Sequence, residues 1–329
     1  MMLEHGLRVS YEAGSADTWL RDSAVLAVFS FGQSPLLAND ARHVPVALPQ
    51  LDDDPVVEVW RVDGTVRSGS WEQLSWARSD NMTMGHLALN LQDFGGMLEA
   101  SRHAYEIVQD FLRQSQHHCP MKIWNYIPGI NVGEGDGECY REFCVGRAEA
   151  WSADSSEQPA MPAATAIGSP EDEHALQVYF LATALPGTNV ENPRQVNAWH
   201  YPRQYGPRSP LFSRGTLMQV NGDRHFLISG TASVVGHETH HDNTADQVHE
   251  SIRNVKSLLA EARRLQGSEH PVLGDAGMLR VYVRDPSEYE QVRRVLETLI
   301  PDQVQRVYLQ GDICRVDLLT EVDGIVACN

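Results

Sequence analysis

Residues 311–323 read GDICRVDLLTEVD and place a thiol, a guanidinium and a carboxylate among apolar side chains. The apolar residues of this stretch are typical of a buried strand. If Glu321 is buried among them, the ionised carboxylate is disfavoured and its pKa rises towards that of a usable acid. The alternative is an edge strand with Glu321 facing water, because glutamate is usually exposed. Choosing between these two interpretations requires the motifs found elsewhere in the sequence.

Length and composition indicate an ordinary globular protein. The chain has 329 residues, of which 42% are hydrophobic, and this length suits one large or two ordinary domains. No apolar run approaches the roughly 20 residues of a membrane span, and the N-terminus lacks the basic and apolar regions of a signal peptide. We therefore expect a cytoplasmic protein.

The formal net charge of −18 disfavours nucleic acid and anionic membranes as partners. An anionic substrate would have to be collected locally by arginines. The five cysteines form no C-x-x-C pair and leave one over, which indicates reduced thiols rather than a disulfide framework.

Hydrophobic periodicity predicts alternating helices and strands. The predicted helices are residues 96–116, 139–151, 244–265 and 287–299. The predicted strands are residues 24–31, 56–62, 83–91, 122–127, 163–167, 177–184, 217–220, 224–229, 279–284 and 306–309. The pair Asn221-Gly222 predicts a hairpin turn between two of these strands.

One succession of elements occurs twice, as helix, strand and helix over residues 96–151 and again over 244–299. Only the second copy continues into a further predicted strand. We therefore expect an α+β protein with two halves of similar architecture, residues 1–155 and 156–329. The boundary lies in the polar, proline-containing segment 152–162.

The segment His237-Glu238-Thr239-His240-His241-Asp242 contains several metal-ligand side chains. In the zinc-protease pattern the histidines stand four apart on a helix, whereas here His237 and His240 stand three apart before a predicted helix. A polar loop that lines a pocket is the better interpretation, with Asp242 or Asn243 capping the helix. The sequence has no phosphate-binding glycine loop, dinucleotide fingerprint or paired-cysteine zinc motif, so we expect no metal and no cofactor.

Two arginine-bearing regions are candidates for binding a carboxylated ring. Arg147 lies on a helix with an otherwise apolar face, and the arginines and tyrosines of 199–214 could provide guanidinium forks and phenol donors. A salt-bridged surface arginine and a rigid proline-rich loop are the respective alternatives. Cys314 could be a nucleophile, but a lone cysteine of this kind is usually an inert small hydrophobe.

Several stretches together resemble the chorismatase family. They are WNYIPGIN at 124–131, YREFCVGRA at 140–148, PAATAIG at 162–168, YPRQYGPRSP at 201–210, SGTASVVGHE at 229–238 and DICR at 312–315. The resemblance runs from about residue 120 to the end of the chain. It implies a fold similar to the reactive-intermediate deaminase (Rid) superfamily, with two Rid-like, chorismate-mutase-like α/β halves. The active site would lie in the C-terminal half, near the cleft between the halves.

Two further features resemble Rid proteins. The stretch DQVHESIRNV at 246–255 is similar to the Rid helix, and LTEV at 319–322 corresponds to the strand that carries a pocket glutamate there. Rid relatives are trimers, but a pocket between halves of one chain also permits a monomer. We expect a monomer or a small homo-oligomer.

The resemblance implies an enzyme that cleaves the enolpyruvyl ether of chorismate and releases pyruvate. One branch of the family adds water and forms a dihydroxycyclohexadiene carboxylate, whereas others aromatise the ring to 3-hydroxybenzoate or to 3- and 4-hydroxybenzoate. Cysteine at 314 and glycine at 230 imply the aromatising chemistry. A Rid-type enamine or imine deaminase and a non-catalytic binding protein are the alternatives.

The resemblance implies Glu321 and Cys314 as catalytic residues. The implied substrate-binding residues are Arg147, Trp199, Tyr201, Tyr205, Arg208, Arg214 and Gly230. Trp199 departs from the family pattern, in which tyrosine is expected, so the way the substrate is held there is open.

Overall fold

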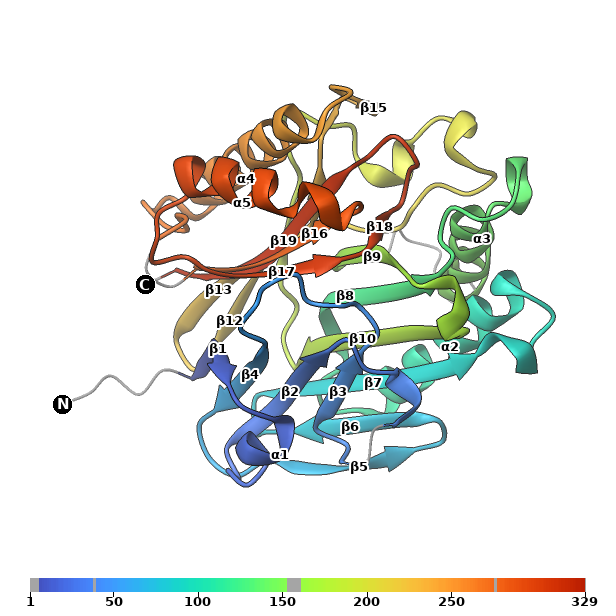
Figure 1. Cartoon of the computed structure of the whole chain (residues 1–329). Helices are drawn as coiled ribbons and strands as arrows, with labels where there is room; N and C mark the ends of the chain where they lie inside the picture. The colour runs from blue at the N-terminus through green and yellow to red at the C-terminus, as the bar shows by residue number, and fades with distance from the viewer. Residues whose placement is uncertain (1–5, 38–39, 153–160, 275–276, 329) are drawn as a thin grey trace.

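Three large β-sheets, one two-stranded sheet and four long helices make up the fold of the described residues (Figure 1). The computed structural model describes residues 6–37, 40–152, 161–274 and 277–328. Within these ranges, no helix combines the length and apolar character needed to cross a membrane.

The first sheet comes from the N-terminal segment and has the order β1-β4-β2-β3. Its strands are β1 (Leu7–Ala13), β2 (Val25–Phe31), β3 (His43–Val46) and β4 (Val56–Val62). The short helix α1 (Ala16–Trp19) packs beside β2. The predicted strands 24–31 and 56–62 are confirmed as β2 and β4.

The second sheet has the order β18-β9-β8-β10-β7-β6-β5. Its strands are β5 (Arg67–Trp71), β6 (Leu74–Arg78), β7 (Met82–Asn90), β8 (Cys119–Pro128), β9 (Ala163–Ser169), β10 (Ala175–Thr183) and β18 (Asp312–Ile313). Helices α2 (Met97–Gln114) and α3 (Cys139–Ser152) cover one face of this sheet through an apolar cluster.

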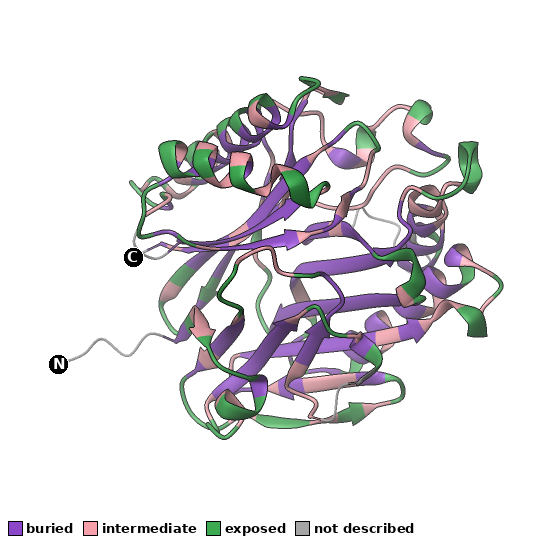
Figure 2. Ribbon diagram, in the orientation of Figure 1, coloured by how far each residue is buried: buried purple, intermediate pink, exposed green. Residues whose placement is uncertain are grey.

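The third sheet has the order β11-β12-β13-β19-β16-β17. Its strands are β11 (Thr188–Val190), β12 (Gly215–Val220), β13 (Asp223–Ala232), β16 (Gly277–Val283), β17 (Gln305–Gln310) and β19 (Thr320–Ala327). Helices α4 (Thr244–Gln266) and α5 (Tyr289–Leu299) lie on its outer face, with their far sides exposed (Figure 2). A two-stranded hairpin of β14 (Val234–Val235) and β15 (Glu238–Thr239) precedes α4.

The α+β class and the two halves of similar architecture are confirmed. Without β18, the second sheet runs β9-β8-β10-β7-β6-β5, which corresponds strand by strand to β17-β16-β19-β13-β12-β11. In both halves a helix separates two parallel strands, β8 from β9 and β16 from β17.

The expectation that only the second half has a final strand is wrong. Strands β9 and β10 follow α3 and pair with β8, so the first half is complete as well. The predicted boundary between residues 155 and 156 lies outside the described residues. The prediction assigned β9 and β10 to the second half. In the structure these strands pair with β8 and therefore belong to the sheet of the first half. The sequence missed this because short strands after a linker carry no sign of their partner.

The inner faces of the three sheets meet in one core. Phe29 of the N-terminal sheet packs on Tyr179 with ring centroids 5.0 Å apart, and Trp124 stacks on the same tyrosine at 4.8 Å. Leu227 and Tyr282 of the third sheet belong to the same cluster. The N-terminal segment, whose role the sequence left open, therefore supplies a third wall of the core.

A buried ion pair lies inside this core. The Arg280 guanidinium donates from Nε and Nη2 to the Glu58 carboxylate at 2.8 and 2.6 Å, and both side chains are nearly inaccessible. Trp60 Nε1 also donates to Glu58 at 2.6 Å, and Arg280 donates to the phenol oxygens of Tyr126 and Tyr179. This network joins a strand of the N-terminal sheet to both larger sheets.

Replacement of Glu58 by Gln should destabilise the protein by about 3–5 kcal/mol, because it leaves a buried guanidinium without its counter-ion. Urea unfolding followed by circular dichroism measures the effect. Glu290→Gln, which breaks an exposed pair with Arg293, is the control and should leave the unfolding midpoint unchanged. Equal midpoints for the two variants would contradict the structural role of the buried pair.

Candidate active site

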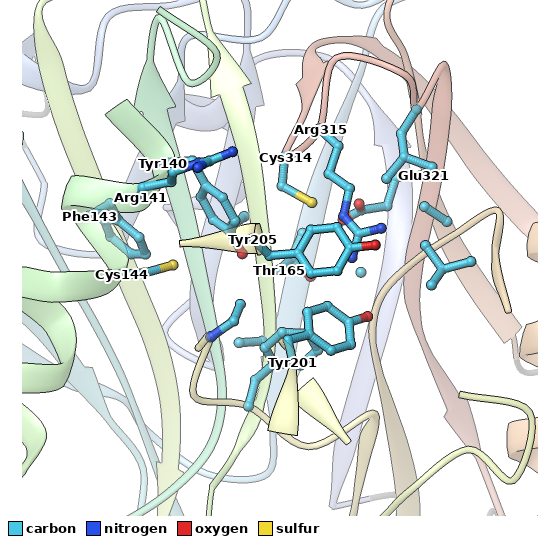
Figure 3. Close-up of a pocket in the computed structure, with 18 of the residues that line it drawn as sticks. Tyr140, Arg141, Phe143, Cys144, Thr165, Tyr201, Tyr205, Cys314, Arg315 and Glu321 are labelled. Carbon is cyan, nitrogen blue, oxygen red and sulfur yellow. The ribbon is translucent and has the colours of Figure 1, made fainter. Parts of the chain in front are cut away.

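A cavity of about 460 Å³ lies between α3 and β9 of the first half and β13 and β19 of the second (Figure 3). Segment 201–214 and the loop after β18 complete its wall. The lining side chains include Asn125, Glu138, Tyr140, Arg141, Phe143, Cys144, Arg147, Thr165, Gln195, Tyr201, Gln204, Tyr205, Phe212, Arg214, Gly230, Cys314, Arg315, Asp317, Leu318 and Glu321.

Glu321 enters the cavity from β19, and the neighbouring strand makes room for it. The pairing of β13 with β19 shifts between Ile228 and Thr231, which indicates a bulge. Gly230 lies in this bulge. A β-carbon at position 230 would overlap Glu321 Oε1, so the bulge and the missing side chain together let the carboxyl fit.

The Glu321 carboxyl is 4% exposed, so the interpretation as a buried carboxyl is correct and the edge-strand alternative is wrong. Burial, the largest cause, and the negative charge of Asp323 raise the pKa of Glu321 to about 8. Arg214 and Lys122 act in the opposite direction. The carboxyl therefore carries a proton at neutral pH and can act as an acid.

Cys314 lines the cavity because β18, which belongs to the second half in sequence, pairs with the sheet of the first half. Residues 312–313 of β18 pair with Gly168 and Ile167 at the edge of the second sheet, which brings Cys314 beside α3. Burial raises the pKa of Cys314 to about 12, with a further contribution from Glu321. Burial also raises the pKa of Cys144 to about 12. Both groups are thiols at neutral pH, so neither is an activated nucleophile.

Arg147 brings a buried cation to the cavity from α3. Its guanidinium lies over the rings of Tyr105 and Trp151, 4.9 and 5.8 Å from their centroids. Its Nε and Nη2 have no hydrogen-bond partner among the described residues. A buried guanidinium with unused donors suits an anionic ligand.

Arg214 provides a second cation at the start of β12. Its Nη2 donates to Val196 O and to the Tyr201 hydroxyl, both at 2.8 Å, and its buried Nε has no partner among the described residues. Glu191 lies nearby, and burial raises the pKa of this carboxyl to about 7 against the effect of Arg214.

Arg315 and Tyr205 form one wall together. The Arg315 guanidinium lies 3.9 Å from the centroid of the Tyr205 ring and donates from Nη1 to His237 O at 2.8 Å. The Tyr205 hydroxyl is 3.2 Å from His237 Nδ1. In Figure 3 the residues of α3 lie to one side and Glu321 to the other, with Cys314 and Tyr205 between them in this view.

Two polar side chains of α4 hold the lining loops in place. Gln247 donates to Asp317 O and accepts from Leu319 N, both at 2.8 Å. Asn254 donates to Ala232 O and Val234 O at 3.1 and 2.9 Å. The segment that resembles the Rid helix thus positions the cavity wall from behind.

Most residues predicted for the site meet in this cavity. The lining includes Arg147, Tyr201, Tyr205, Arg214, Gly230, Cys314 and Glu321. Trp199 and Arg208 are not among the lining residues. Trp199 packs against His200, and Arg208 is exposed. Proline-rich loops lack a fixed periodicity, so the sequence could not show which side chains of 199–214 face inwards.

Tyr140, Cys144 and Thr165 also line the cavity, although no pattern in the sequence marked them as site residues. Arg315, whose guanidinium stands out in residues 311–323, lines it as well. Each lies inside a stretch that carried the family resemblance, so proximity to those motifs was the available signal.

The histidine-rich segment 237–242 lies at β15 and the start of α4. Asn243 Oδ1 accepts from Asp246 N at 3.0 Å, which confirms the predicted helix cap. In the part of the chain that the structure describes, no group of histidine, cysteine, aspartate or glutamate side chains is arranged to hold a metal ion. All five cysteines are free.

Comparisons of the sequence and of the fold with known proteins identify relatives of this chain. Residues 58–182 match the family model "Chorismatase FkbO/Hyg5-like, N-terminal". The chain is 35% identical to a chorismatase of Streptomyces rapamycinicus over 298 residues, 88% of each protein. It is 34% identical to a 3-hydroxybenzoate synthase of Streptomyces hygroscopicus over 306 residues, 89% of this chain and 87% of the relative.

A crystal structure of a chorismatase superimposes with a TM-score of 0.87 at 32% identity, covering 97% of this chain and 98% of the other. The similarity spans nearly the whole length of both proteins. The chain belongs to the chorismatase family of enzymes.

Proposed function

We propose that this chorismatase converts chorismate to pyruvate and 3-hydroxybenzoate, with Glu321 as the general acid. The proposal rests on one arrangement, a buried and protonated Glu321 in a cavity that also presents Cys314 and unpaired arginine donors. The named relatives include both a chorismatase and a 3-hydroxybenzoate synthase at nearly equal identity. Identity therefore does not select the product, and the proposed product rests on Cys314 and Gly230.

Glu321 would protonate the methylene carbon of the enolpyruvyl group. This proton transfer forms an oxocarbenium ion and weakens the bond between the ether oxygen and the ring. The neighbouring ring hydroxyl can then displace pyruvate, lose its own proton and form an epoxide-like intermediate. The hydroxyl loses one proton for each proton that Glu321 supplies, so Glu321 can be protonated again within the same turnover.

Opening of the epoxide and loss of a ring proton give the aromatic product. Chorismate contains the same atoms as pyruvate and hydroxybenzoate together, so this route needs no added water and no cofactor. Cys314 would lie beside the ring as a neutral thiol and favour opening over attack by water. Its raised pKa supports the role of a weak hydrogen-bond donor rather than of a nucleophile.

Arg147 and Arg214 would bind the two carboxylates of the substrate. Their unpaired donors lie in a cavity of a protein with a net charge of −18, so the positive charge that attracts an anion is concentrated there. Tyr201 and Tyr205 would supply further hydroxyl donors. Arg208 is exposed and has no part in this proposal.

Glu321→Gln should lower kcat for pyruvate release by a factor of about 10²–10⁴, because the amide cannot donate a proton as the carboxyl does. A coupled lactate dehydrogenase assay with chorismate measures the rate. Circular dichroism should show a folded variant. Undiminished pyruvate release would exclude Glu321 as the acid, and wild-type release of ammonia from imines without turnover of chorismate would favour a deaminase.

The rate of pyruvate release should fall as pH rises through about 8, since the acid must be protonated and the pKa of Glu321 is raised to about 8. Below this pH the carboxyl holds its proton and kcat should be level. A profile of kcat against pH measures the effect. Glu191→Gln is the control, because burial raises the pKa of Glu191 to about 7. The kcat profile of this variant should fall at the same alkaline pH as that of the wild type. A flat wild-type profile across this range would contradict the acid role.

Cys314→Ala should change the product rather than abolish turnover. Without the thiol, water has access to the epoxide-like intermediate, so part of the product should become the non-aromatic dihydroxycyclohexadiene carboxylate. Liquid chromatography of the reaction mixture measures the ratio. Cys328→Ala, which removes a buried thiol outside the cavity, should leave the product unchanged. An identical product profile for Cys314→Ala would remove Cys314 from the aromatising step.

A further inference from the structure

We propose that Asp323 and Lys122, which lie behind Glu321 and outside the residues lining the cavity, form a charge pair that sets the proton affinity of Glu321, with Asp323 favouring the protonated acid and Lys122 opposing it. This inference rests on the proposed role of Glu321 as the acid. Asp323 and Lys122 would act as positioning residues, because neither reaches the cavity.

Asp323 lies two residues after Glu321 on β19. Side chains of a strand alternate between its faces, so the two carboxyl groups lie on the same face. Both are buried, with 1% of Asp323 and 4% of Glu321 exposed. Two neighbouring carboxylates in such surroundings repel each other, so one proton stays bound to the pair.

The hydrogen bonds decide which carboxyl keeps that proton. Asp323 Oδ2 accepts from Thr165 Oγ1 at 2.6 Å and from the Tyr282 hydroxyl at 3.2 Å, and it lies 3.3 Å from Lys122 Nζ. Among the described residues, no group donates a hydrogen bond to the Glu321 carboxyl. Donors stabilise the ionised form, so Asp323 carries the charge and Glu321 the proton.

Lys122 lowers the free-energy cost of burying the Asp323 carboxylate and also holds the backbone of β13 in place. It extends from β8 of the first sheet, is fully buried, and donates from Nζ to Ile228 O at 2.7 Å. Ile228 is the last residue of β13 in register before the bulge that accommodates Glu321. The same ammonium therefore holds both Asp323 and the backbone that shapes the Glu321 position.

The other groups that face Glu321 do not replace Asp323. Arg214, at the start of β12, lowers the pKa of Glu321, as Lys122 does. Cys314 after β18 and Tyr140 of α3 also lie near it, but burial raises the pKa of both well above neutrality, so they are uncharged. Besides burial, Asp323 is the group on the described chain that favours the protonated acid.

Two single substitutions should move the titration of Glu321 in opposite directions. Asp323→Asn removes the negative charge and should shift the alkaline limb of kcat to lower pH by on the order of one unit. Lys122→Gln removes the positive charge and should shift the limb to higher pH. The double variant leaves no unpaired charge and should lie between the two.

A second readout does not depend on turnover. The infrared band of the protonated carboxyl that is lost in Glu321→Gln can be followed against pH in each variant. This band also separates Glu321 from Lys122, because burial lowers the pKa of Lys122 to about 8 as well. Tyr282→Phe is the matched control. It removes only the longer of the two hydrogen bonds to Asp323 and leaves Thr165, Lys122 and every charge in place, so the band should titrate within a few tenths of a unit of the wild type.

An unmoved carboxyl band in folded Asp323→Asn or folded Lys122→Gln would overturn the inference, as would an equal shift in Tyr282→Phe. If either single variant does not fold, the other and the double variant still decide, because each has its own expected direction. If the band shifts as expected but the wild type releases no pyruvate from chorismate, the proposed function fails while the charge pair is upheld.

Discussion

A buried lysine joins the two large sheets behind Glu321, outside the residues that line the cavity. Lys122 of β8 reaches Asp323 of β19 and the carbonyl oxygen of Ile228 on β13, so one side chain of the first half is bonded to two strands of the second. An ammonium and a carboxylate are stable in such a core only with each other and with further donors, which Thr165 and Tyr282 supply. The position of β9 against β13 and β19, and with it the shape of the cavity, depends on this contact.

Packing of the halves also explains how a strongly acidic protein can hold an anion. Arg147 comes from α3 of the first half, whereas Arg214 and Arg315 come from the second. Each of these elements contributes one of the three cations, and the cavity brings them together. In its surroundings of low polarity, their attraction for a carboxylate is stronger than at the surface. Arg280 is not one of these cations, because it lies outside the cavity lining and Glu58 of the N-terminal sheet neutralises it within the shared core.

Much of the fold was predictable because its elements have clear local patterns. The long amphipathic helices and the strands beside them follow the periodicity of their own residues, and their repetition indicated two similar halves. The pairing of β9 and β10 with β8, and the packing of the N-terminal sheet against the two larger sheets, could not be predicted, because such partners are chosen by contacts distant in sequence. For the site, Glu321, Cys314 and Arg147 stood out as unusual residues in apolar stretches. Trp199 and Arg208 fitted the same expectation but do not line the cavity, and Thr165, which does, did not stand out.

The resemblance to the family, the α+β class and the polar residues that burial would make chemically unusual could all be recognised in the amino-acid sequence. Those properties depend on local pattern and on residue type. Three features could not be recognised there: Glu321 faces Gly230 across a bulge, β18 pairs with the other sheet and carries Cys314 there, and Asp323 lies against Lys122. Each of these results from packing between distant segments. This packing removes Glu321 from water and favours the protonated form of its carboxyl at neutral pH.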